Sequence, residues 1–121
     1  MNNKILIVDD DPHNIFALKL TLKARKYELE SCMMAEEAIQ KLKEDKDFCV
    51  VLMDMMMPEI DGYEAIRIIR NTPGISDTPI IAVTAQAMEE DRIKCLEAGA
   101  QDYITKPIDV DLLISAIEKH C

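Results

Sequence analysis

The sequence predicts an α/β protein: a doubly wound, five-stranded parallel sheet with helices on both faces. Five short apolar segments alternate with five segments whose apolar residues recur at helical spacing. This alternation is typical of parallel strands joined by right-handed crossovers. The most apolar segment, Cys49–Met53, is followed at once by Asp54. A carboxylate at the end of a buried strand is costly to desolvate unless its charge is used, so it marks a candidate site.

The first half of the chain predicts strand, helix, strand and helix. Lys4–Val8 is short and apolar, as in a strand buried on both faces. Asp11 as N-cap and Pro12 in the first turn begin a helix that extends to Arg25. Tyr27–Cys32 mixes apolar and polar residues, as expected near a sheet edge. The second helix carries an apolar stripe at Ala35, Ala38, Ile39 and Leu42.

The second half repeats this alternation. Phe48–Met53 fits the centre of the sheet because it is the most apolar strand. Asp61–Gly62 interrupts regular secondary structure before a third helix, and turn residues at Asn71–Gly74 end that helix. Pro79–Val83 and Gln101–Thr105 are the last two strands, each followed by a helix. The apolar residues of the last three helices are Ala65, Ile66 and Ile69; Ile93 and Leu96; and Leu113, Ala116 and Ile117.

Composition fits one acidic domain over residues 1–121. Hydrophobic residues make up 49% and charged residues 31% of the chain, which is globular composition. The net charge of -9 argues against nucleic acid or an anionic membrane as partner, since both bind clustered Lys and Arg. No apolar stretch approaches about 18 residues, and no signal-peptide pattern is present. We therefore expect a cytoplasmic protein without membrane insertion.

The cysteines lie far apart in the chain and form no C-x-x-C pair, so neither a zinc site nor a dithiol redox site is predicted. They are Cys32, Cys49, Cys95 and Cys121. We expect reduced thiols in a cytosolic core. Cys121 is expected to be a flexible exposed thiol, or the end of a fragment of a longer chain.

Reactive polar residues end four of the five strands. They are Asp9, Asp10, Asp54, Thr84 and Lys106. Parallel strands place their carboxyl ends at one edge of the sheet, so these side chains are expected to meet there. Two carboxylates about 4 Å apart repel by roughly 4 kcal/mol at an effective dielectric near 20. A divalent cation is therefore expected, and carboxylate oxygens suit Mg²⁺, with Mn²⁺ as a substitute.

The same residues suit phosphoryl transfer. The ionised Asp54 needs no general base to become a nucleophile, and it would form an aspartyl phosphate. The hydroxyl of Thr84 and the ammonium of Lys106 could both bind phosphoryl oxygens. Positioning and charge neutralisation are then the main catalytic effects.

Four motifs at these strand ends resemble those of response-regulator receiver domains, and the resemblance covers about residues 4–119. They are Ile-Leu-Ile-Val-Asp-Asp at 5–10, Met-Asp-Met-Met-Met-Pro-Glu-Ile-Asp-Gly at 53–62, Val-Thr-Ala at 83–85 and Asp-Tyr-Ile-Thr-Lys-Pro at 102–107. The resemblance implies the flavodoxin-like strand order 2-1-3-4-5. It also implies a role in a two-component phosphorelay rather than a turnover enzyme.

The resemblance assigns Asp54 as phosphoacceptor and metal ligand. It makes Asp10 a direct metal ligand, Asp9 a ligand through water, and the main-chain carbonyl of Met56 a further ligand. Met56 lies two residues beyond the acceptor, where the family tunes loss of the phosphate, and Gln86 lies two beyond Thr84. An apolar Met56 would hinder an attacking water, so we predict a fairly long-lived phosphoprotein.

Thr84 and Tyr103 are similar to the family's switch pair, and Lys106 to its phosphoryl-binding lysine. A cis bond between Lys106 and Pro107 is implied as well. The expected signalling surface is the fourth helix, fifth strand and fifth helix. Implied partners are a histidine kinase or histidine phosphotransfer protein and a downstream effector protein, with a phosphorylation-dependent dimer left open. Residues 11–14, 91–92 and 95–99 resemble receivers of hybrid histidine kinases.

Two other functions remain open. A Mg²⁺-dependent phosphatase could also work through an aspartyl phosphate, although such enzymes place an acid where this chain has Met56. A receiver-like module that only binds a partner would not need the complete set of acids, hydroxyl and lysine.

Several residues have alternative roles. Asp11 is expected as a helix N-cap rather than a metal ligand. His13, as a metal ligand, and His120, as a phosphorylated histidine, are weighed against solvated helix positions, which we favour. Residues 53–57 could suggest soft-metal binding, but adaptable packing is the more common role of methionine. Strand packing alone could explain Tyr103. Its place before Lys106 makes the switch role an equally good interpretation.

Overall fold

The computed structural model describes residues 3–57, 60–86 and 88–121, and these form the predicted α/β fold. Five parallel strands lie in the order β2-β1-β3-β4-β5, as the resemblance implies. The strands are β1 (Lys4–Val8), β2 (Glu28–Cys32), β3 (Phe48–Asp54), β4 (Ile80–Thr84) and β5 (Asp102–Thr105). The helices are α1 (Pro12–Lys23), α2 (Ala35–Glu44), α3 (Gly62–Arg70), α4 (Glu89–Ala98) and α5 (Val110–His120).

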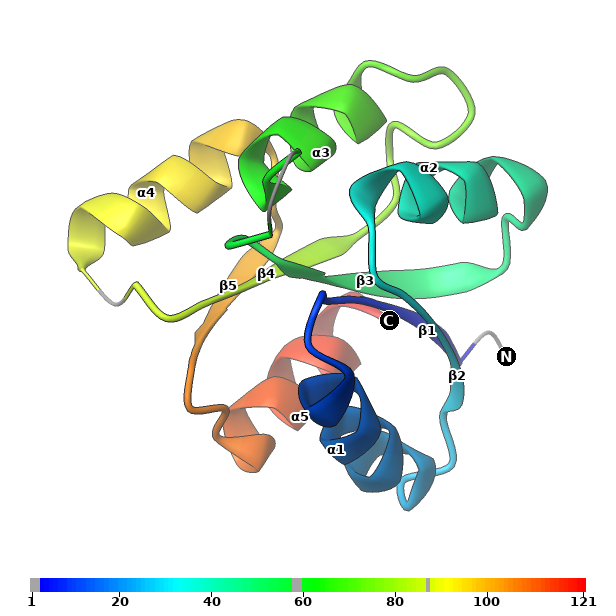
Figure 1. The fold of residues 1–121 in the computed structure, drawn as a ribbon, viewed down its shortest axis with the longest axis vertical. Coiled ribbons are helices and arrows are strands. Elements are labelled where there is room, and N and C mark those ends of the chain that lie inside the picture. The colour runs from blue at the N-terminus through cyan, green and yellow to red at the C-terminus, as the bar shows by residue number, and fades with distance from the viewer. Residues whose placement is uncertain (1–2, 58–59, 87) are drawn as a thin grey trace.

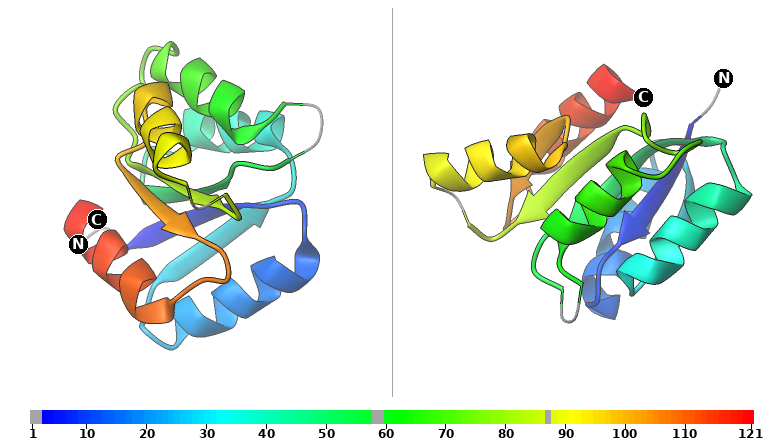
Figure 2. Two further views of the ribbon diagram at one scale, coloured as in Figure 1. Left: turned by 90° about the vertical axis from the view of Figure 1, so that its left-hand side faces the viewer. Right: turned by 90° about the horizontal axis from the view of Figure 1, so that it is seen from above.

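The helices cover both faces of the sheet, with α2, α3 and α4 on one face and α1 and α5 on the other (Figures 1 and 2). Successive residues of a strand point to opposite faces. Leu6 and Val8 of β1 therefore join the core under α2–α4, while Ile5 and Ile7 join the core under α1 and α5. The doubly wound architecture is confirmed.

The positions of two strands agree with their predicted burial. All seven residues of β3 are buried, because this central strand has strands on both sides and helices on both faces. In β2, at the edge of the sheet, Cys32 is the buried residue. Predicted element ends differ by a residue or two; β4, for example, runs through Thr84.

Gly62 begins α3 in close contact with the end of β3. A Cβ atom at this position would lie 2.6 Å from Met55 Cα and 2.7 Å from the main-chain oxygen of Asp54. Asp61 caps the helix by accepting a hydrogen bond from the main-chain amide of Glu64. The absence of a side chain at Gly62 thus lets the helix support the strand end that carries Asp54.

The buried side of α4 is not the one that its largest apolar residues suggest. Cys95 and Ala98 are buried, whereas Ile93 and Leu96 are exposed. Small residues let the helix pack closely on α3 and β5, so the larger side chains point outward. No helix in the described part of the chain is long and apolar enough to cross a membrane.

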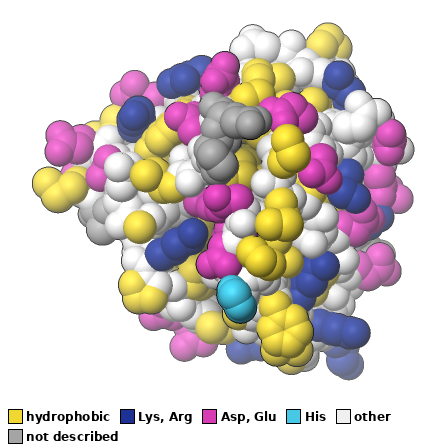
Figure 3. Space-filling model, viewed as in Figure 1, with side chains coloured by type: hydrophobic (Ala, Val, Ile, Leu, Met, Phe, Trp, Pro, Cys, Tyr) yellow, Lys and Arg dark blue, Asp and Glu magenta, His cyan; other side chains and the backbone are white. Residues whose placement is uncertain are grey.

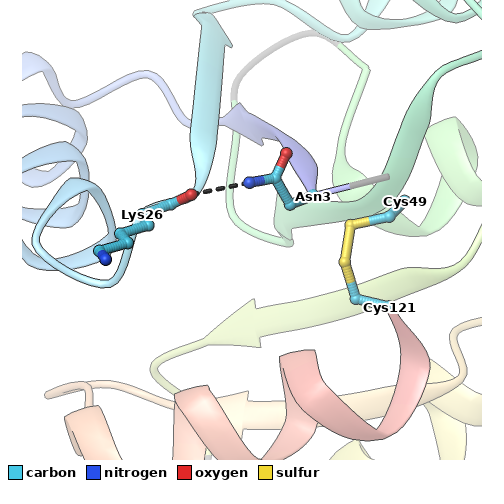
Figure 4. The surroundings of a disulfide bond; sticks show 4 residues. All are labelled: Asn3, Lys26, Cys49 and Cys121. Atoms are coloured by element: carbon cyan, nitrogen blue, oxygen red, sulfur yellow. Dashed lines mark hydrogen bonds between the residues drawn. A yellow bond between two sulfur atoms is a disulfide. The ribbon is translucent and has the colours of Figure 1, made fainter. Parts of the chain in front are cut away.

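The prediction of reduced thiols is wrong for two of the cysteines. Cys49, near the start of β3, and Cys121, directly after α5, form a disulfide (Figure 4). Helix α5 runs antiparallel to the strands, so its end returns to the amino edge of the sheet and brings the two Cα atoms within 4.9 Å of each other. Cys121 is therefore not a free thiol. Cys32 and Cys95 are free and buried, as expected.

Candidate functional site

The carboxyl edge of the sheet gathers the buried polar residues of the protein. Among the described residues, the buried polar or charged side chains are Asp9, Asp54 and Thr84, each at most 3% exposed. All three lie at the ends of neighbouring strands, β1, β3 and β4. Acidic side chains also gather near the middle of the face seen in Figure 3, which looks onto this edge.

Three carboxylates lie close enough to share a ligand. One oxygen each from Asp9, Asp10 and Asp54 can be chosen so that all three lie within 4.8 Å of one another. Asp9 and Asp54 are buried, while Asp10 is exposed. Hard oxygen donors of this kind suit Mg²⁺ or Mn²⁺, and the negative charge of the cluster favours a divalent cation.

Asp54 receives two contacts on the same oxygen. Its Oδ1 accepts a hydrogen bond of 3.1 Å from the main-chain amide of Met56 and lies 3.6 Å from Lys106 Nζ. Burial raises the pKa of Asp54 above its usual value, and the charges of Asp9 and Asp10 raise it further, against the lowering effects of Met56 and Lys106. Among the described residues, both of these contacts are to Oδ1, so Oδ2 is the freer oxygen.

Asp9 is held by donors on both of its oxygens. Oδ1 accepts a 2.9 Å hydrogen bond from the main-chain amide of Asp11, and Oδ2 accepts one from the side-chain amide of Asn14. Asn14 had no individual role in the sequence analysis. Its place in the first turn of α1 could have indicated one, because helical side chains tilt back toward the N-terminus and hence toward the strand end.

The expected switch pair is connected through one residue. The hydroxyl oxygen of Thr84 accepts a 3.1 Å hydrogen bond from the main-chain amide of Gln86, and the hydroxyl of Tyr103 donates to the main-chain oxygen of Gln86. Tyr103 is partly buried and packs against the core under α2–α4. A shift of Gln86 in the β4–α4 loop would therefore change the hydrogen bonds of both side chains.

Lys106 lies between two of the acids. Its Nζ is 3.6 Å from Asp54 and 3.8 Å from Asp9. The main-chain amide of Lys106 donates to the carbonyl of Thr84 at 2.8 Å, and the bond to Pro107 is cis, as the resemblance implies. The end of β5 is thereby held beside the end of β4.

The alternative roles of Asp11 and the two histidines are now distinguishable. Asp11 caps α1, as predicted, by accepting from the amide of His13. The side chain of His13 is 98% exposed and lies outside the acidic cluster. For His120 the prediction of a solvated position is wrong: its side chain is 16% exposed, with Nε2 3.2 Å from Asp102. The last turn of α5 packs against the start of β5, which shields this ring.

The methionines at the end of β3 and directly after it differ in burial, as packing requires. Met53, Met55 and Met57 are buried in the core under α2–α4, whereas Met56 is 53% exposed. Core packing therefore accounts for three of the four. The neighbouring Pro58 and Glu59, which belong to the motif at 53–62, lie outside the described residues.

Comparison with known proteins gives one family. The family model "Response regulator receiver domain" matches residues 5–118. The regulatory protein VanRB of Enterococcus faecalis is 34% identical over 118 residues, which are 98% of this chain and 52% of VanRB. The chain therefore spans about half the length of that relative.

Two solved structures are similar over nearly their whole length. The chemotaxis protein CheY4 of Vibrio cholerae has a TM-score of 0.90 at 26% identity, covering 100% of both chains. The receiver domain of sensor histidine kinase PA1611 of Pseudomonas aeruginosa, solved with magnesium in its active-site cleft, has a TM-score of 0.88 at 32% identity, covering 99% of this chain and 98% of that one. The fold, the strand-end acids and the family match lead to one conclusion: this chain belongs to the response regulator receiver domain family.

Proposed function

We propose that residues 1–121 form a single receiver domain that accepts a phosphoryl group on Asp54 in a two-component phosphorelay. The donor is a phosphohistidine of a histidine kinase or histidine phosphotransfer protein. One observation supports this most strongly: a buried carboxylate with a raised pKa lies beside two further acids and one ammonium. Such an arrangement is costly for folding, and its charges suit a phosphoryl group and a divalent cation.

The transfer step needs no proton from Asp54. An oxygen of Asp54 forms a bond to phosphorus while the phosphorus–nitrogen bond of the donor breaks. We take this oxygen as Oδ2, because Met56 and Lys106 both contact Oδ1. The electron pair of that bond returns to the imidazole, which takes up a proton from water. Lys106 and the hydroxyl of Thr84 are the groups on this chain that bind the phosphoryl oxygens.

The residues proposed to hold Mg²⁺, or Mn²⁺ in its place, are Asp9, Asp10, Asp54 and the main-chain carbonyl of Met56. The oxygen donors fit such an ion, and the magnesium in the PA1611 receiver domain supports the same assignment. When bound, the ion supplies positive charge that offsets the acids and the phosphoryl oxygens. Asp9 is the ligand we expect to act through water, because protein donors already occupy both of its oxygens.

The proposed output is a change in the surface of α4, β5 and α5. If the hydroxyl of Thr84 turns to the phosphoryl group, its hydrogen bond from Gln86 is lost, and Gln86 also accepts from Tyr103. The movement would thus reach Tyr103 on β5. Exposed apolar residues of α4, Ile93 and Leu96, are available there for an effector or for a second phosphorylated copy. We place the domain in the cytoplasm because kinases of this kind act there.

The test uses acetyl phosphate and magnesium, with the mass of the intact protein as readout. Wild type is expected to gain one phosphoryl group, and Asp54→Asn none. Asp45→Asn, which removes an acid far from the site, is expected to gain one like wild type. No gain by wild type would favour a passive binding module. Release of many equivalents of phosphate from an ester per protein would instead favour the phosphatase.

The lifetime of the phosphoprotein tests the role of Met56. We expect a fairly long-lived species, because the apolar side chain beside Asp54 neither binds nor activates water. Loss of the phosphoryl group within seconds at neutral pH with magnesium would contradict this expectation. Met56→Glu should shorten the lifetime.

A further inference from the structure

We propose that Asn14 is a positioning residue of this site: its side-chain amide holds Asp9 and keeps Lys106 from closing onto that carboxylate. The proposal rests on the phosphoacceptor function above. The main observation concerns one oxygen, Asp9 Oδ2. It accepts a hydrogen bond from Asn14 Nδ2 and lies 3.8 Å from Lys106 Nζ. Two donors thus approach a single acceptor from different elements, α1 and the end of β5.

Asp9 is oriented by the protein alone. Its side chain is buried, its Oδ1 accepts from the amide of Asp11, and its Oδ2 accepts from Asn14. Two donors compensate a buried carboxylate, so it keeps one orientation. Asp10, in contrast, is exposed, and its carboxylate accepts no hydrogen bond from the residues that the structure describes.

Lys106 is close to two acids without being hydrogen-bonded to either. Its distances of 3.6 Å to Asp54 and 3.8 Å to Asp9 exceed the 2.7–3.2 Å range of an N–H···O hydrogen bond. The ammonium is therefore free to turn toward an incoming phosphoryl group. Without the amide of Asn14, Asp9 Oδ2 would lack its hydrogen-bonded donor, and Lys106 is the donor near enough to replace it.

The amide of Asn14 is not needed to cap α1. Asp11 already caps the helix through the amide of His13, and the main-chain carbonyl of Asp11 accepts from Ile15. Asparagine also has no advantage in helix propensity at such a position. The amide therefore acts on Asp9 rather than on the end of the helix.

Loss of this amide has two expected consequences. Lys106 paired with Asp9 would offset part of the charge that binds Mg²⁺, and it would no longer lie ready for the phosphoryl group. Residues that support metal ligands typically change metal affinity by about 10–100-fold when removed. We expect the lower end, about tenfold, because Asp11 still holds the other oxygen of Asp9.

The experiment is a double-mutant cycle on the whole chain. Asn14→Leu keeps the size of the side chain and removes the donor, and Lys106→Met removes the ammonium. Magnesium affinity is measured by calorimetry for wild type, both single variants and the double variant. We expect Asn14→Leu to weaken binding about tenfold in wild type but by less than about twofold beside Lys106→Met. An equal loss in both backgrounds would mean that Asn14 does not act by keeping Lys106 from Asp9, and would overturn the proposal.

Controls separate this inference from the proposed function. His13→Leu introduces the same side chain one residue earlier, at an exposed position, and should bind magnesium like wild type. Asn14→Ala serves in place of Asn14→Leu if the latter does not fold by circular dichroism. If wild type binds no magnesium and gains no phosphoryl group, the proposed function fails. If wild type does both and Asn14→Leu matches it, only the role of Asn14 is refuted.

Discussion

Toward the amino edge of the sheet, Lys4 forms ion pairs with Glu30 and Asp45, whereas at the carboxyl edge three acids lie near one ammonium, that of Lys106. The amino edge also carries the Cys49–Cys121 disulfide. Lys41 also pairs with Glu30, so two cations face two acids at the amino edge, and the disulfide links β3 to the residue after α5. At the carboxyl edge the acids outnumber the nearby ammonium, and two of them, Asp9 and Asp54, are buried, which is costly without an added cation. Stabilising contacts thus lie at the amino edge of the sheet, and the candidate functional site lies at the carboxyl edge.

The largest expected effect concerns the disulfide at the amino edge. A cross-link between positions 72 residues apart restricts the unfolded chain, and its removal should cost about 4 kcal/mol. We expect Cys121→Ser to lower the free energy of unfolding by this amount, as measured by urea denaturation under oxidising conditions. With a reducing agent the two proteins should become equal. A difference that persists in reducing agent would show that the disulfide is not its cause.

The next effect concerns the unmatched charge at the carboxyl edge. A ligand that binds only the folded protein stabilises it by about 2.7 kcal/mol at one hundred times its Kd. Magnesium should therefore raise the Tm of wild type and do so much less for Asp54→Asn. Asp45→Asn, at the amino edge, should respond like wild type. Equal shifts in wild type and Asp54→Asn would place the ion elsewhere.

The close packing at Gly62 predicts a loss of about 1–3 kcal/mol for Gly62→Ala, the usual cost of overpacking. The added Cβ would meet the main chain of Met55 and Asp54, so the loop must move. Phosphorylation of Asp54 should slow as well, since its position changes. Gly74→Ala offers a control for destabilisation alone: its φ of 90° is unsuited to alanine, but it lies outside this loop. Phosphorylation at the wild-type rate in Gly62→Ala would contradict the positioning argument.

The smallest effect is a difference in pH dependence between the two edges. The pKa of Asp54 is raised from its usual 3.8, so the folded protein binds this proton more tightly than the unfolded chain does. The ionised carboxylate of Asp54 destabilises the folded protein. This cost is fully present above the raised pKa and fades as the pH falls toward 3.8. Asp54→Asn should therefore stabilise the metal-free protein at neutral pH, and this gain should fade as the pH falls toward 3.8.

At the amino edge the sign is reversed. Hydrogen bonds from Lys4 hold the pKa of Glu30 and of Asp45 below their usual values. Their contribution to stability is complete above the unfolded pKa and is lost as the pH falls through the lowered one. Glu30→Gln should therefore lower the free energy of unfolding at neutral pH and have little effect on it in acid. Denaturation curves of Glu30→Gln and Asp54→Asn across pH measure both signs, and changes of the same sign would refute the contrast.

How far the sequence could predict the site depended on the kind of information needed. Asp9, Asp54 and Thr84 directly follow or end apolar strands, and parallel strands necessarily bring such ends together. The hydrogen-bond partners of these residues were harder to predict from the sequence. Asn14 lies in a helix, and the link through Gln86 uses main-chain atoms, so no pattern of residue types marks either of them. The hydrogen bonds at the site had to come from the structure.

The sequence by itself determined the alternation of strands and helices and the set of strand-end groups, because periodicity and chain order are local properties. The strand order followed from its resemblance to a family. Only the tertiary structure decided which distant residues meet: Cys49 with Cys121, His120 with Asp102, and Asn14 with Asp9. Such contacts depend on how each helix lies against the sheet, which the packing of the whole core decides and no short segment encodes.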